Sequence, residues 1–525
     1  MTRLLFATVL VTVGLPSAAQ AQAERWWGHV TALADDSMRG RETGSPEHRK
    51  AAEYVASVFQ RAGLRPAGTD GWFQPVRFKV RRINEARSSL ALVRPGRAER
   101  LRLGTDATIN LRGSAAGTVD APLVFIGYGL VSPEQGYDDL KGLTLKGKVA
   151  VVLAGVAPGG IPGPELAAAR AAAAEALKAG GAIGVLTIAS PHAEIPWDRY
   201  VFSRLHPQMR FADDTAAGGH TAVAVVVNPS SAERVFAGSR QRYAELQALA
   251  DSGAALRGFD LPVRLRATVA VDESEAVSDN VVGLLPGADP ARASEYVALT
   301  AHLDHLGVGL PQGGDSIYNG AMDNASGVAT LLEAATALGR QPRPRRSLLF
   351  VAVTGEEKGL LGSDWFAGHP TIPEGSSLVA NLNTDMFLPL NPLRQLLVNG
   401  LEESDLADDV RRAAAKAGIQ VITDPEPERN AFVRSDQFSF IRRGIPALSL
   451  KGGFALGTPE HERILRWRAE RYHGVEDEAS QPVNRQAAEA FNRLYPNLIL
   501  EVANRPTRPA WYPTSAFRPE NTGAH

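Results

Sequence analysis

The strongest constraint on the fold lies in the second half of the chain, where short apolar runs alternate with helical periodicity. Four runs are predicted strands, at residues 281–285, 296–301, 348–354 and 378–383. Between the second and third, residues 326–338 repeat apolar side chains at helical spacing and end at Gly339. Strands that alternate with helices form a largely parallel sheet covered on both faces. The predicted fold class is therefore α/β, a mostly parallel twisted sheet flanked by helices, and ligands of such sheets bind beyond the carboxyl ends of the strands.

The chain of 525 residues is longer than one hydrophobic core usually serves, so more than one domain is expected. Between about residues 117 and 271, an alanine-rich helix at 165–179 separates β-branched runs at 148–153 and 182–188. This strand, helix, strand unit indicates a smaller α/β or β-rich module. We predict the N-terminal part of the main domain at 24–114, the inserted domain at 115–272, the rest of the main domain at 273–504, and a tail of uncertain order at 505–525.

An amphipathic helix is predicted near the start of the main domain. Ser45 suits the N-cap, Pro46 suits the first helical position, and Gly63 is placed to end the helix.

Composition excludes several classes of protein. Hydrophobic residues make up 44% and charged residues 22%, as in ordinary soluble globular proteins. Lys and Arg together number 56 against 57 for Asp and Glu, and neither sign forms a long block, so a nucleic-acid partner is not expected. Cysteine is absent, which excludes disulfides, thiolate chemistry and a cysteine-linked lipid anchor. The sequence does not indicate an oligomeric state.

Residues 1–23 are typical of a cleavable export signal. Arg3 precedes an apolar run at 4–15, and small residues follow in an Ala-x-Ala pattern that fits cleavage after Ala21 or Ala23. The run is too short for a membrane-spanning helix, and later apolar runs are interrupted by charges, Gly or Pro. We expect an exported protein, periplasmic or extracellular, without a membrane partner.

The strand at 297–301 ends in His302-Leu303-Asp304. Because side chains alternate with period two, His302 and Asp304 leave the strand on the same side. One can bind a metal while the other fixes the imidazole or supports the neighbouring ligands. A histidine at a strand end is more often a simple polar terminus, so this pair alone is weak evidence.

Asp323 lies in a glycine-flanked turn just before the helix at 326–338. Taken alone, a helix cap is the commoner explanation for such an aspartate. Its two carboxylate oxygens are equally suited to bridging two cations.

Two adjacent carboxylates, Glu356 and Glu357, follow the strand at 348–354. They repel one another, and a bound cation removes that cost. If Glu357 binds the metal, Glu356 is free to take a proton from water as general base. Glu356 and Asp304 are the candidate catalytic residues.

Two further ligand candidates complete the set. Asp385 follows the strand at 378–383, and His473 lies in a turn rich in acidic residues. Mixed imidazole and carboxylate ligands without thiolate suit Zn²⁺, with Mn²⁺ or Co²⁺ as alternatives, and a shared carboxylate allows two ions. The rival ligands His305 and His461 are less expected, because His305 requires a sharp turn after the strand and His461 lies in a charged helical stretch.

The segments AHLDHLG, GAMDNASG, GEEKGLLGS, NTD and YHGVEDE occur in this order and resemble the M28 family of co-catalytic zinc aminopeptidases. The resemblance covers the helix from Ser45 and most of residues 279–504. It implies two Zn²⁺ ions with Asp323 as the bridge and Glu356 as the base. The implied ligands are His302, Asp323 and Asp385 for one ion and Asp323, Glu357 and His473 for the other.

The inserted segment, with GYGL near Tyr128 and GKVAVVLAG from Gly147, resembles a protease-associated (PA) domain. Two positions depart from the family pattern: Gln437 stands where a histidine is common, and Met322 stands where an acidic residue is common. Neither is an implied ligand, so the departures concern substrate contacts and the support of the ligands.

The predicted function is secreted, zinc-dependent hydrolysis of a peptide bond at the N-terminus of a peptide substrate. A carboxypeptidase or dipeptidase acting through the same site is an alternative, which the cationic residues Arg429, Arg434 and Lys451 keep open. A non-catalytic binding protein on the same scaffold is a third, although all five ligand positions and the base are filled.

Overall fold

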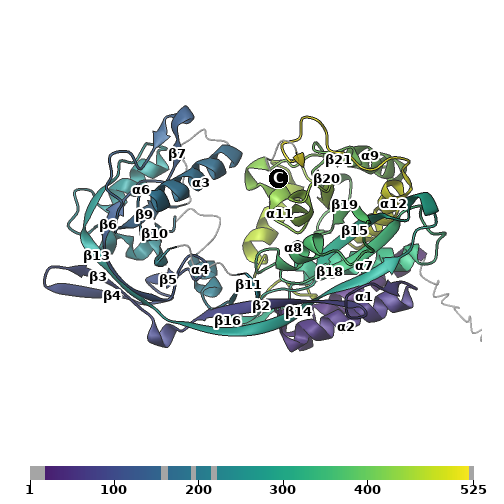
Figure 1. Cartoon of the computed structure of the whole chain (residues 1–525), viewed down its shortest axis with the longest axis horizontal. Coiled ribbons are helices and arrows are strands. Elements are labelled where there is room, and N and C mark those ends of the chain that lie inside the picture. Colours follow the sequence, from purple (N-terminus) through teal and green to yellow (C-terminus); the bar gives the residue numbers. More distant parts are fainter. Residues whose placement is uncertain (1–17, 155–162, 191–196, 215–220, 520–525) are drawn as a thin grey trace, which may run out of the picture.

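Two separate β-sheets organise the computed structural model, which describes residues 18–154, 163–190, 197–214 and 221–519 (Figure 1). The ten-stranded sheet carries the carboxyl-terminal half of the chain and is called the main lobe. The eight-stranded sheet contains most of the inserted segment and is called the second lobe. Each lobe has its own large cluster of buried apolar side chains.

The main sheet is parallel at its centre and mostly antiparallel toward its edges, although β20 and β21 at one edge pair in parallel. β18 and β19 both pair in parallel with β15, and β22 pairs in parallel with β19. β14 pairs antiparallel with β18 and β2, and β20 pairs antiparallel with β22. The strands lie in the order β11 (Gln208–Phe211), β2 (Phe73–Ile83), β14 (Val271–Leu285), β18 (Ser347–Val353), β15 (Glu295–His302), β19 (Ser377–Asn383), β22 (Ala447–Gly452), β20 (Gln395–Asn399) and β21 (Gln420–Ile422), with β1 (Arg65–Pro66) beside β14.

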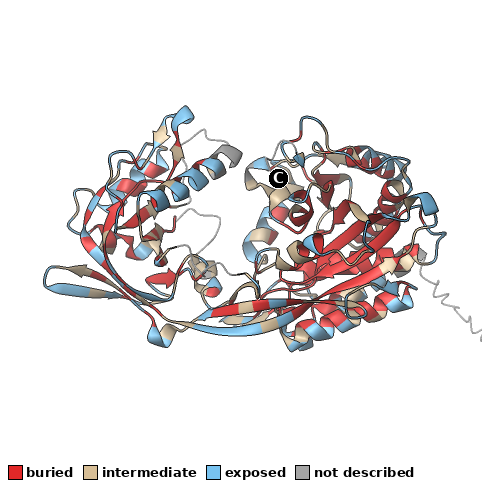
Figure 2. Cartoon of the chain, viewed as in Figure 1, coloured by how far each residue is buried: buried red, intermediate tan, exposed pale blue. Residues whose placement is uncertain are grey.

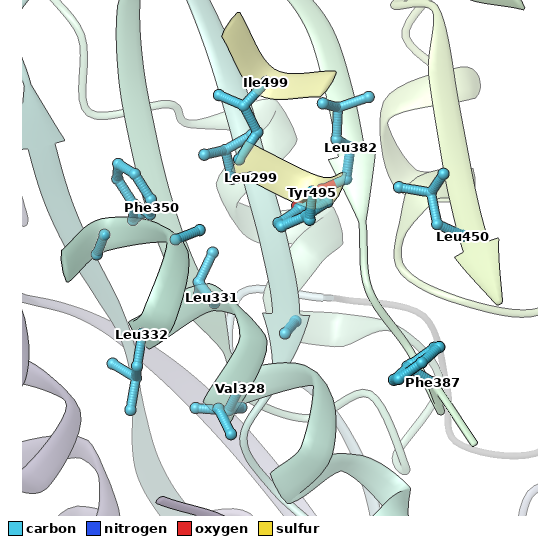
Figure 3. Packing of buried hydrophobic residues seen from close by; sticks show 14 of the residues in the cluster. Leu299, Val328, Leu331, Leu332, Phe350, Leu382, Phe387, Leu450, Tyr495 and Ile499 are labelled. Atoms are coloured by element: carbon cyan, nitrogen blue, oxygen red, sulfur yellow. Dashed lines mark hydrogen bonds between the residues drawn. The ribbon is translucent and has the colours of Figure 1, made fainter. Parts of the chain in front are cut away.

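Helices cover both faces of this sheet. One face packs against α1 (Ala18–Leu33), α2 (Pro46–Arg61), α7 (Ser326–Leu338), α9 (Leu406–Ala417) and α12 (Arg485–Asn504). The other packs against α8 (Leu361–Gly368) and α10 (Gln437–Ile441), and α11 (Pro459–Glu470) precedes the loop that carries His473. Alternate residues of the central strands therefore enter different cores: Leu299 and Phe350 join the first (Figure 3), whereas Leu349 joins the second. The central strands are accordingly buried throughout, while the outer helix faces are exposed (Figure 2).

The predicted elements of the main lobe are confirmed. The helix at 326–338 is α7, and the four predicted strands correspond to β14, β15, β18 and β19, although the run at 348–354 extends one residue beyond the end of β18. Ser45 caps α2 through a hydrogen bond from the His48 amide to its Oγ (3.0 Å), and Gly63 follows the helix at φ 82°, a value that favours glycine.

The second sheet contains the predicted strand, helix, strand unit. β9 (Val149–Leu153) and β10 (Gly184–Ile188) pair in parallel and are joined through α3 (Gly163–Ala179). The complete order is β4 (Arg97–Leu101), β3 (Ser89–Arg94), β13 (Phe259–Val269), β6 (Gly117–Phe125), β9, β10, β12 (Val223–Val227) and β5 (Ala107–Ile109). Shorter elements are α4 (Trp197–Ser203), α5 (Ala232–Phe236), α6 (Tyr243–Asp251), the pair β7 (Val131–Ser132) and β8 (Tyr137–Asp138), and, in the main lobe, β16 (Gly307–Gln312) with β17 (Asp315–Tyr318).

The sheets do not divide at the predicted domain boundaries. β3, β4 and β5 belong to the second sheet although they precede residue 115, and β11 of the inserted segment pairs with β2 of the main sheet. The β-branched composition used to recognise the module is weak in the charged strand β4, which explains why the sheet begins earlier than the pattern indicated. β2 and β14 form a long antiparallel ribbon that connects the lobes, from the pair Val271 and Ile83 to the pair Val281 and Phe73 (Figure 1).

The ends of the chain differ in what the structure describes. Residues 1–17 of the predicted export signal lie outside the described residues, and 18–23 begin α1. The tail, predicted to be of uncertain order, is packed as far as residue 519: Trp511 donates to the Gly444 carbonyl (2.8 Å) and Arg508 pairs with Glu295 (2.9 Å). In the described part of the chain, no helix combines the length and apolar character needed to cross a bilayer.

Candidate metal centre and active site

Three parallel strands deliver the predicted site residues to one edge of the main sheet. His302 ends β15, Glu356 and Glu357 follow β18, and Asp385 follows β19. Because these strands are neighbours and run in the same direction, their carboxyl ends meet. Asp323 enters from the turn before α7.

His473 joins this edge from the loop after α11. With His302, Asp323, Glu356 and Asp385 it lines a cavity of about 130 Å³. A larger adjoining cavity of about 590 Å³ contacts Glu357 and is partly lined by α4 of the inserted segment.

The first ligand group consists of His302, Asp323 and Asp385. The His302 Nε2 atom lies 3.2 Å from Asp323 Oδ1 and 3.3 Å from Asp385 Oδ1, and all three side chains are buried. Two donors about 2.0–2.1 Å from one tetrahedral ion would themselves lie about 3.3 Å apart. The spacing of these atoms therefore fits a shared cation.

The second group uses the other oxygen of Asp323. The His473 Nε2 atom lies 3.1 Å from Asp323 Oδ2 and 3.4 Å from Glu357 Oε1. Asp323 thus presents one oxygen to each group, as a bridging carboxylate does. The structure brings all five predicted ligands together.

His305 also lies in the second group, contrary to the sequence expectation. Its Nδ1 atom is 2.9 Å from Glu357 Oε1, and with Asp323 and Glu357 it forms a set of donor atoms close enough to hold one ion. The chain does turn after β15, where the His305 amide donates to the Arg41 carbonyl and leads into Gly307 at φ 76°. The sequence made His305 a less expected ligand because the local pattern does not show this turn. His461, by contrast, lies in α11 with its Nε2 3.5 Å from Glu426, as expected for a histidine outside the ligand set.

Asp304 supports the ligands through backbone contacts. Its buried carboxylate accepts hydrogen bonds from the Thr43 hydroxyl (2.8 Å) and from the amides of Glu356 (3.1 Å) and Glu357 (3.3 Å). His302 Nδ1 lies 3.1 Å from the Asp304 backbone carbonyl, not from its carboxylate. Of the two roles that the sequence left open for this pair, Asp304 therefore positions the Glu356–Glu357 turn, while its carbonyl orients the imidazole.

Two buried residues that the sequence analysis did not single out hold the turn of Asp323. Asp477 accepts hydrogen bonds from the amides of Met322 (2.9 Å) and Asp323 (3.0 Å). The Arg41 guanidinium donates to the carbonyls of Asn319 (2.7 Å) and Gly320 (3.0 Å). The acidic residues after His473 were a signal for Asp477, but nothing in the pattern around Arg41 indicates burial.

The two adjacent glutamates have opposite pKa shifts. Burial raises the pKa of Glu356 well above its usual value, and the neighbouring Glu357 charge adds to the effect against the opposing influence of His302. Burial also acts to raise the pKa of Glu357, but His473 and the hydrogen bond from His305 lower it below its usual range. Groups whose pKa values are driven apart are suited to different roles. The pattern is consistent with Glu357 as ligand and Glu356 as proton carrier.

The segment that departs from the family pattern contacts a strand end, not a ligand. Asn383 donates to Ser435 Oγ (3.0 Å) and to Gln437 Oε1 (2.9 Å). Asp436 between them is fully buried, and burial raises its pKa to about 7. Gln437 thus positions the end of β19, which leads to Asp385.

Comparisons with known proteins relate the part of the chain that carries this site to a family of peptidases. Residues 280–499 match the model of "Peptidase family M28". Aminopeptidase YwaD of Bacillus subtilis is 26% identical over 235 residues, which are 44% of this chain and 46% of YwaD. Leupeptin-inactivating enzyme 1 of Streptomyces exfoliatus is 30% identical over 183 residues, 34% of this chain and 37% of that enzyme. The chain thus aligns with less than half the length of these curated relatives.

Solved structures share the fold over nearly the whole chain. The aminopeptidase from Aneurinibacillus sp. strain AM-1 has a TM-score of 0.58 at 19% identity and covers 93% of this chain and 96% of its own. BSAP, a zinc aminopeptidase from Bacillus subtilis, has a TM-score of 0.53 at 21% identity and covers 92% and 95%. The family match at residues 280–499 contains all the ligand candidates, so the part of the main lobe that carries the site is similar to peptidase family M28.

Proposed function

We propose that this protein is a zinc-dependent aminopeptidase that removes N-terminal residues from peptides through a two-metal site. The observation that carries the proposal is the position of Asp323, whose two oxygens face two different groups of imidazole and carboxylate donors within one cavity. Its relatives supply the reaction class: proteins of similar sequence and fold are named aminopeptidases.

The donor set fits two divalent cations. His302 and Asp385 would hold one ion, Glu357 and His473 the other, and Asp323 both. Borderline imidazole and carboxylate donors favour Zn²⁺, with Mn²⁺ or Co²⁺ also suited. Paired ions of this kind, when bound, lower the pKa of water from 15.7 to roughly 7 and polarise a carbonyl.

Glu356 is the general base in this proposal. It lines the cavity beside His302 and Asp385, and no role as a ligand is needed for it. In peptide hydrolysis it takes the proton of the attacking water and passes it to the leaving amine. Asp304 contributes by fixing the backbone of the Glu356–Glu357 turn.

Export and the nature of the insertion belong to the same proposal. The start of the sequence supports a secreted enzyme, periplasmic or extracellular, and GYGL with GKVAVVLAG supports a PA domain as the second lobe. Since α4 lines the larger cavity, the inserted segment contributes to the surroundings of the site.

A carboxypeptidase or dipeptidase acting through the same metals is the second candidate. The observation in its favour is that Arg429, Arg434 and Lys451 line the cavity, where they could receive a terminal carboxylate. A binding protein without activity has less support, because the ligand positions and the base are all present.

The test is a scan of blocked peptides with the purified, zinc-loaded full-length protein. An aminopeptidase releases the first residue from peptides with a free amine and an amidated carboxyl end, and chelation abolishes that release. Cleavage only of N-acylated peptides with a free carboxylate would replace this proposal by the carboxypeptidase alternative. Bound zinc with no cleavage of either set would favour a binding protein.

A further inference from the structure

We propose that the cavity beside the ligand cluster binds a carboxylate of the substrate through Arg429, Arg434 and Lys451, either that of an acidic side chain or that of a dipeptide's terminus. The inference deepens the proposed function and rests on it for the reaction itself. The three cationic side chains line the same 130 Å³ cavity as His302 and Asp385.

None of the three cations forms an ion pair with an acid among the described residues, although the charge of Lys451, against the effect of burial, lowers the pKa of Asp385. Within the described ranges, none of their side chains forms a hydrogen bond or an ion pair. The fourth cation of the cavity wall behaves differently, because Arg468 pairs with Glu426 at 2.6 Å. Cavity walls that carry unpaired guanidinium and ammonium groups attract anions and bind carboxylates through charge-assisted hydrogen bonds.

Strand register places Lys451 beside the site. Asn383 of β19 pairs with Ser449 of β22, and two residues farther along these parallel strands come Asp385 and Lys451. Lys451 also pairs across the sheet with Leu397, another residue of the cavity wall. Its position next to a predicted ligand therefore follows from the sheet itself and not from a surface loop.

The two arginines belong to a different segment of the cavity wall. Arg429 ends a short helical turn, Pro427–Arg429, and Arg434 follows another, Ala431–Val433. Both line the smaller and the larger cavity, as do Tyr472 and His473. Cations on β22 and on this segment thus flank a single space that opens beside the ligands.

Neutralising the ligand carboxylates does not account for these cations. Asp323, Glu357, Asp385 and Glu356 carry at most four negative charges, and the two divalent ions of the proposed function supply four positive charges. Of the remaining acids of the cavity, Glu426 pairs with Arg468, and Asp424 sets a single negative charge against the three cations. The excess of positive charge therefore faces the substrate.

The carboxylate has two possible sources near the scissile bond. One is the side chain of an N-terminal Glu or Asp, whose methylene groups would contact Met386, Leu388 and Leu397 in the cavity. The other is the terminal carboxylate of a dipeptide. Either carboxylate would interact with the cations in the same way. Pairs of substrates that differ in only one of the two carboxylates distinguish the two sources.

The experiment measures kcat/KM of the zinc-loaded full chain for Glu-, Gln- and Leu-p-nitroanilides, and for Leu-Gly against Leu-Gly amide. We expect a preference of roughly tenfold for Glu over Gln if the side chain is the source, or for Leu-Gly over its amide if the terminus is. Arg434→Met and Lys451→Met should each reduce that ratio severalfold, and Arg434→Lys should restore most of it. Arg343→Met, an exposed arginine outside the cavity, is the matched control and should leave all rates unchanged.

Two results would overturn the inference: ratios near one for both substrate pairs, or ratios that neither variant changes. Because Arg434 is exposed, we expect Arg434→Met to fold normally, so a change in its kcat/KM ratio reports on substrate binding. If no peptide is cleaved, the proposed function fails separately, and calorimetric binding of L-glutamate against L-glutamine decides the inference. Equal binding of the two amino acids rejects it, and tighter glutamate binding that Arg434→Met abolishes supports it.

Discussion

The two lobes show that an acid whose pKa is raised by partial or complete burial does not by itself make a site. In the second lobe, burial raises the pKa of Asp139 to about 6, and its carboxylate accepts the Leu130 amide at 3.0 Å. In the main lobe, burial likewise raises the pKa of Glu356. Both groups of ligand-type side chains found among the described residues belong to the main lobe. The convergence of donors from several strand ends separates the two acids.

The strands that carry these acids also differ in their interiors. β9 and β12 of the second lobe contain only Val, Ala and Leu. β15 and β19 of the main lobe contain Thr300, Asn381 and Asn383, whose side chains form a continuous chain of hydrogen bonds (2.8–3.0 Å) toward Gln437. Most polar atoms of these three side chains are paired, although Asn381 Oδ1 has no partner among the described residues, and such a buried network restricts the strands to one geometry. The polar interior of the main sheet thus holds the strand ends that carry the ligands.

Replacement of one acid in each lobe gives the largest predicted contrast. Glu356→Gln should lower turnover by a factor of about 10²–10⁴, because a general base is lost, while bound zinc stays near normal. Asp139→Asn should leave turnover unchanged. The measurements are kcat on an aminoacyl anilide and zinc by atomic absorption. Near-normal turnover in Glu356→Gln would show that this residue is not the general base. The acids of the two lobes would then not differ in catalytic role.

The two histidines of the second ligand group sharpen the comparison further. His473→Ala should reduce bound zinc to about one ion per chain, since its Nε2 faces both Asp323 and Glu357. His305→Ala should retain more zinc, because among the described residues His305 forms an ion pair with Glu357 alone (2.9 Å), whereas His473 faces two ligands. Zinc titration of both variants measures this difference. If His473→Ala kept both zinc ions and His305→Ala lost one, His305 would be the ligand and His473 would not.

Local patterns predicted the main lobe well because its elements follow simple periodicities. The sequence identifies acidic and imidazole side chains at the ends of strands, such as Asp385. Parallel pairing of those strands brings their carboxyl ends to one edge of the sheet, as a general rule predicts. His305 was underestimated because its position depends on Arg41, a residue more than 260 positions earlier in the chain whose carbonyl accepts the His305 amide. Contacts of that kind leave no local signal.

The second lobe was harder to delimit for a related reason. The strands at 89–101 are short and rich in charge, and they join the sheet only through pairing with β13 near residue 265. Long-range pairing of exposed strands is decided by register across the whole fold, not by composition. The sequence also could not predict that Arg434 and Lys451 form no ion pair among the described residues, because it shows which residues are charged but not which of them pair.

The separate cores of the lobes predict separate unfolding. Phe350 is fully buried in the main core, and Phe125 is fully buried in the second core against Phe236 (5.3 Å between ring centroids). Replacing either with Ala should cost about 3–5 kcal/mol. Calorimetry with and without zinc should show two unfolding transitions. Phe350→Ala should lower the midpoint temperature of the transition that zinc raises, and Phe125→Ala should lower that of the transition that zinc does not change. A single transition shifted equally by both variants would mean that the lobes unfold as one unit.

The smallest predicted effect is a pH dependence of stability that originates behind the site. His48 is buried in α2, with its Nδ1 3.2 Å from Ser278 Oγ, which lies 2.6 Å from Thr354 Oγ1. Burial, assisted by the charges of Arg41 and Arg49, lowers the pKa of His48 to about 3. The folded protein therefore keeps this imidazole neutral, whereas the unfolded chain protonates it below about pH 6.5.

The contribution of His48 is thus complete above about pH 6.5 and is lost as the pH falls toward 3. Between pH 6.5 and pH 5 the loss should approach about 2 kcal/mol, at about 1.4 kcal/mol per pH unit. Asp139 has the opposite sign: a raised carboxyl pKa stabilises the folded state at low pH, and that stability disappears as the pH rises past about 6. Denaturant unfolding of His48→Gln and Asp139→Asn at both pH values, each compared with wild type, isolates the two terms. If His48→Gln loses as much stability as wild type between these pH values, the buried imidazole of the main lobe is not the group that titrates.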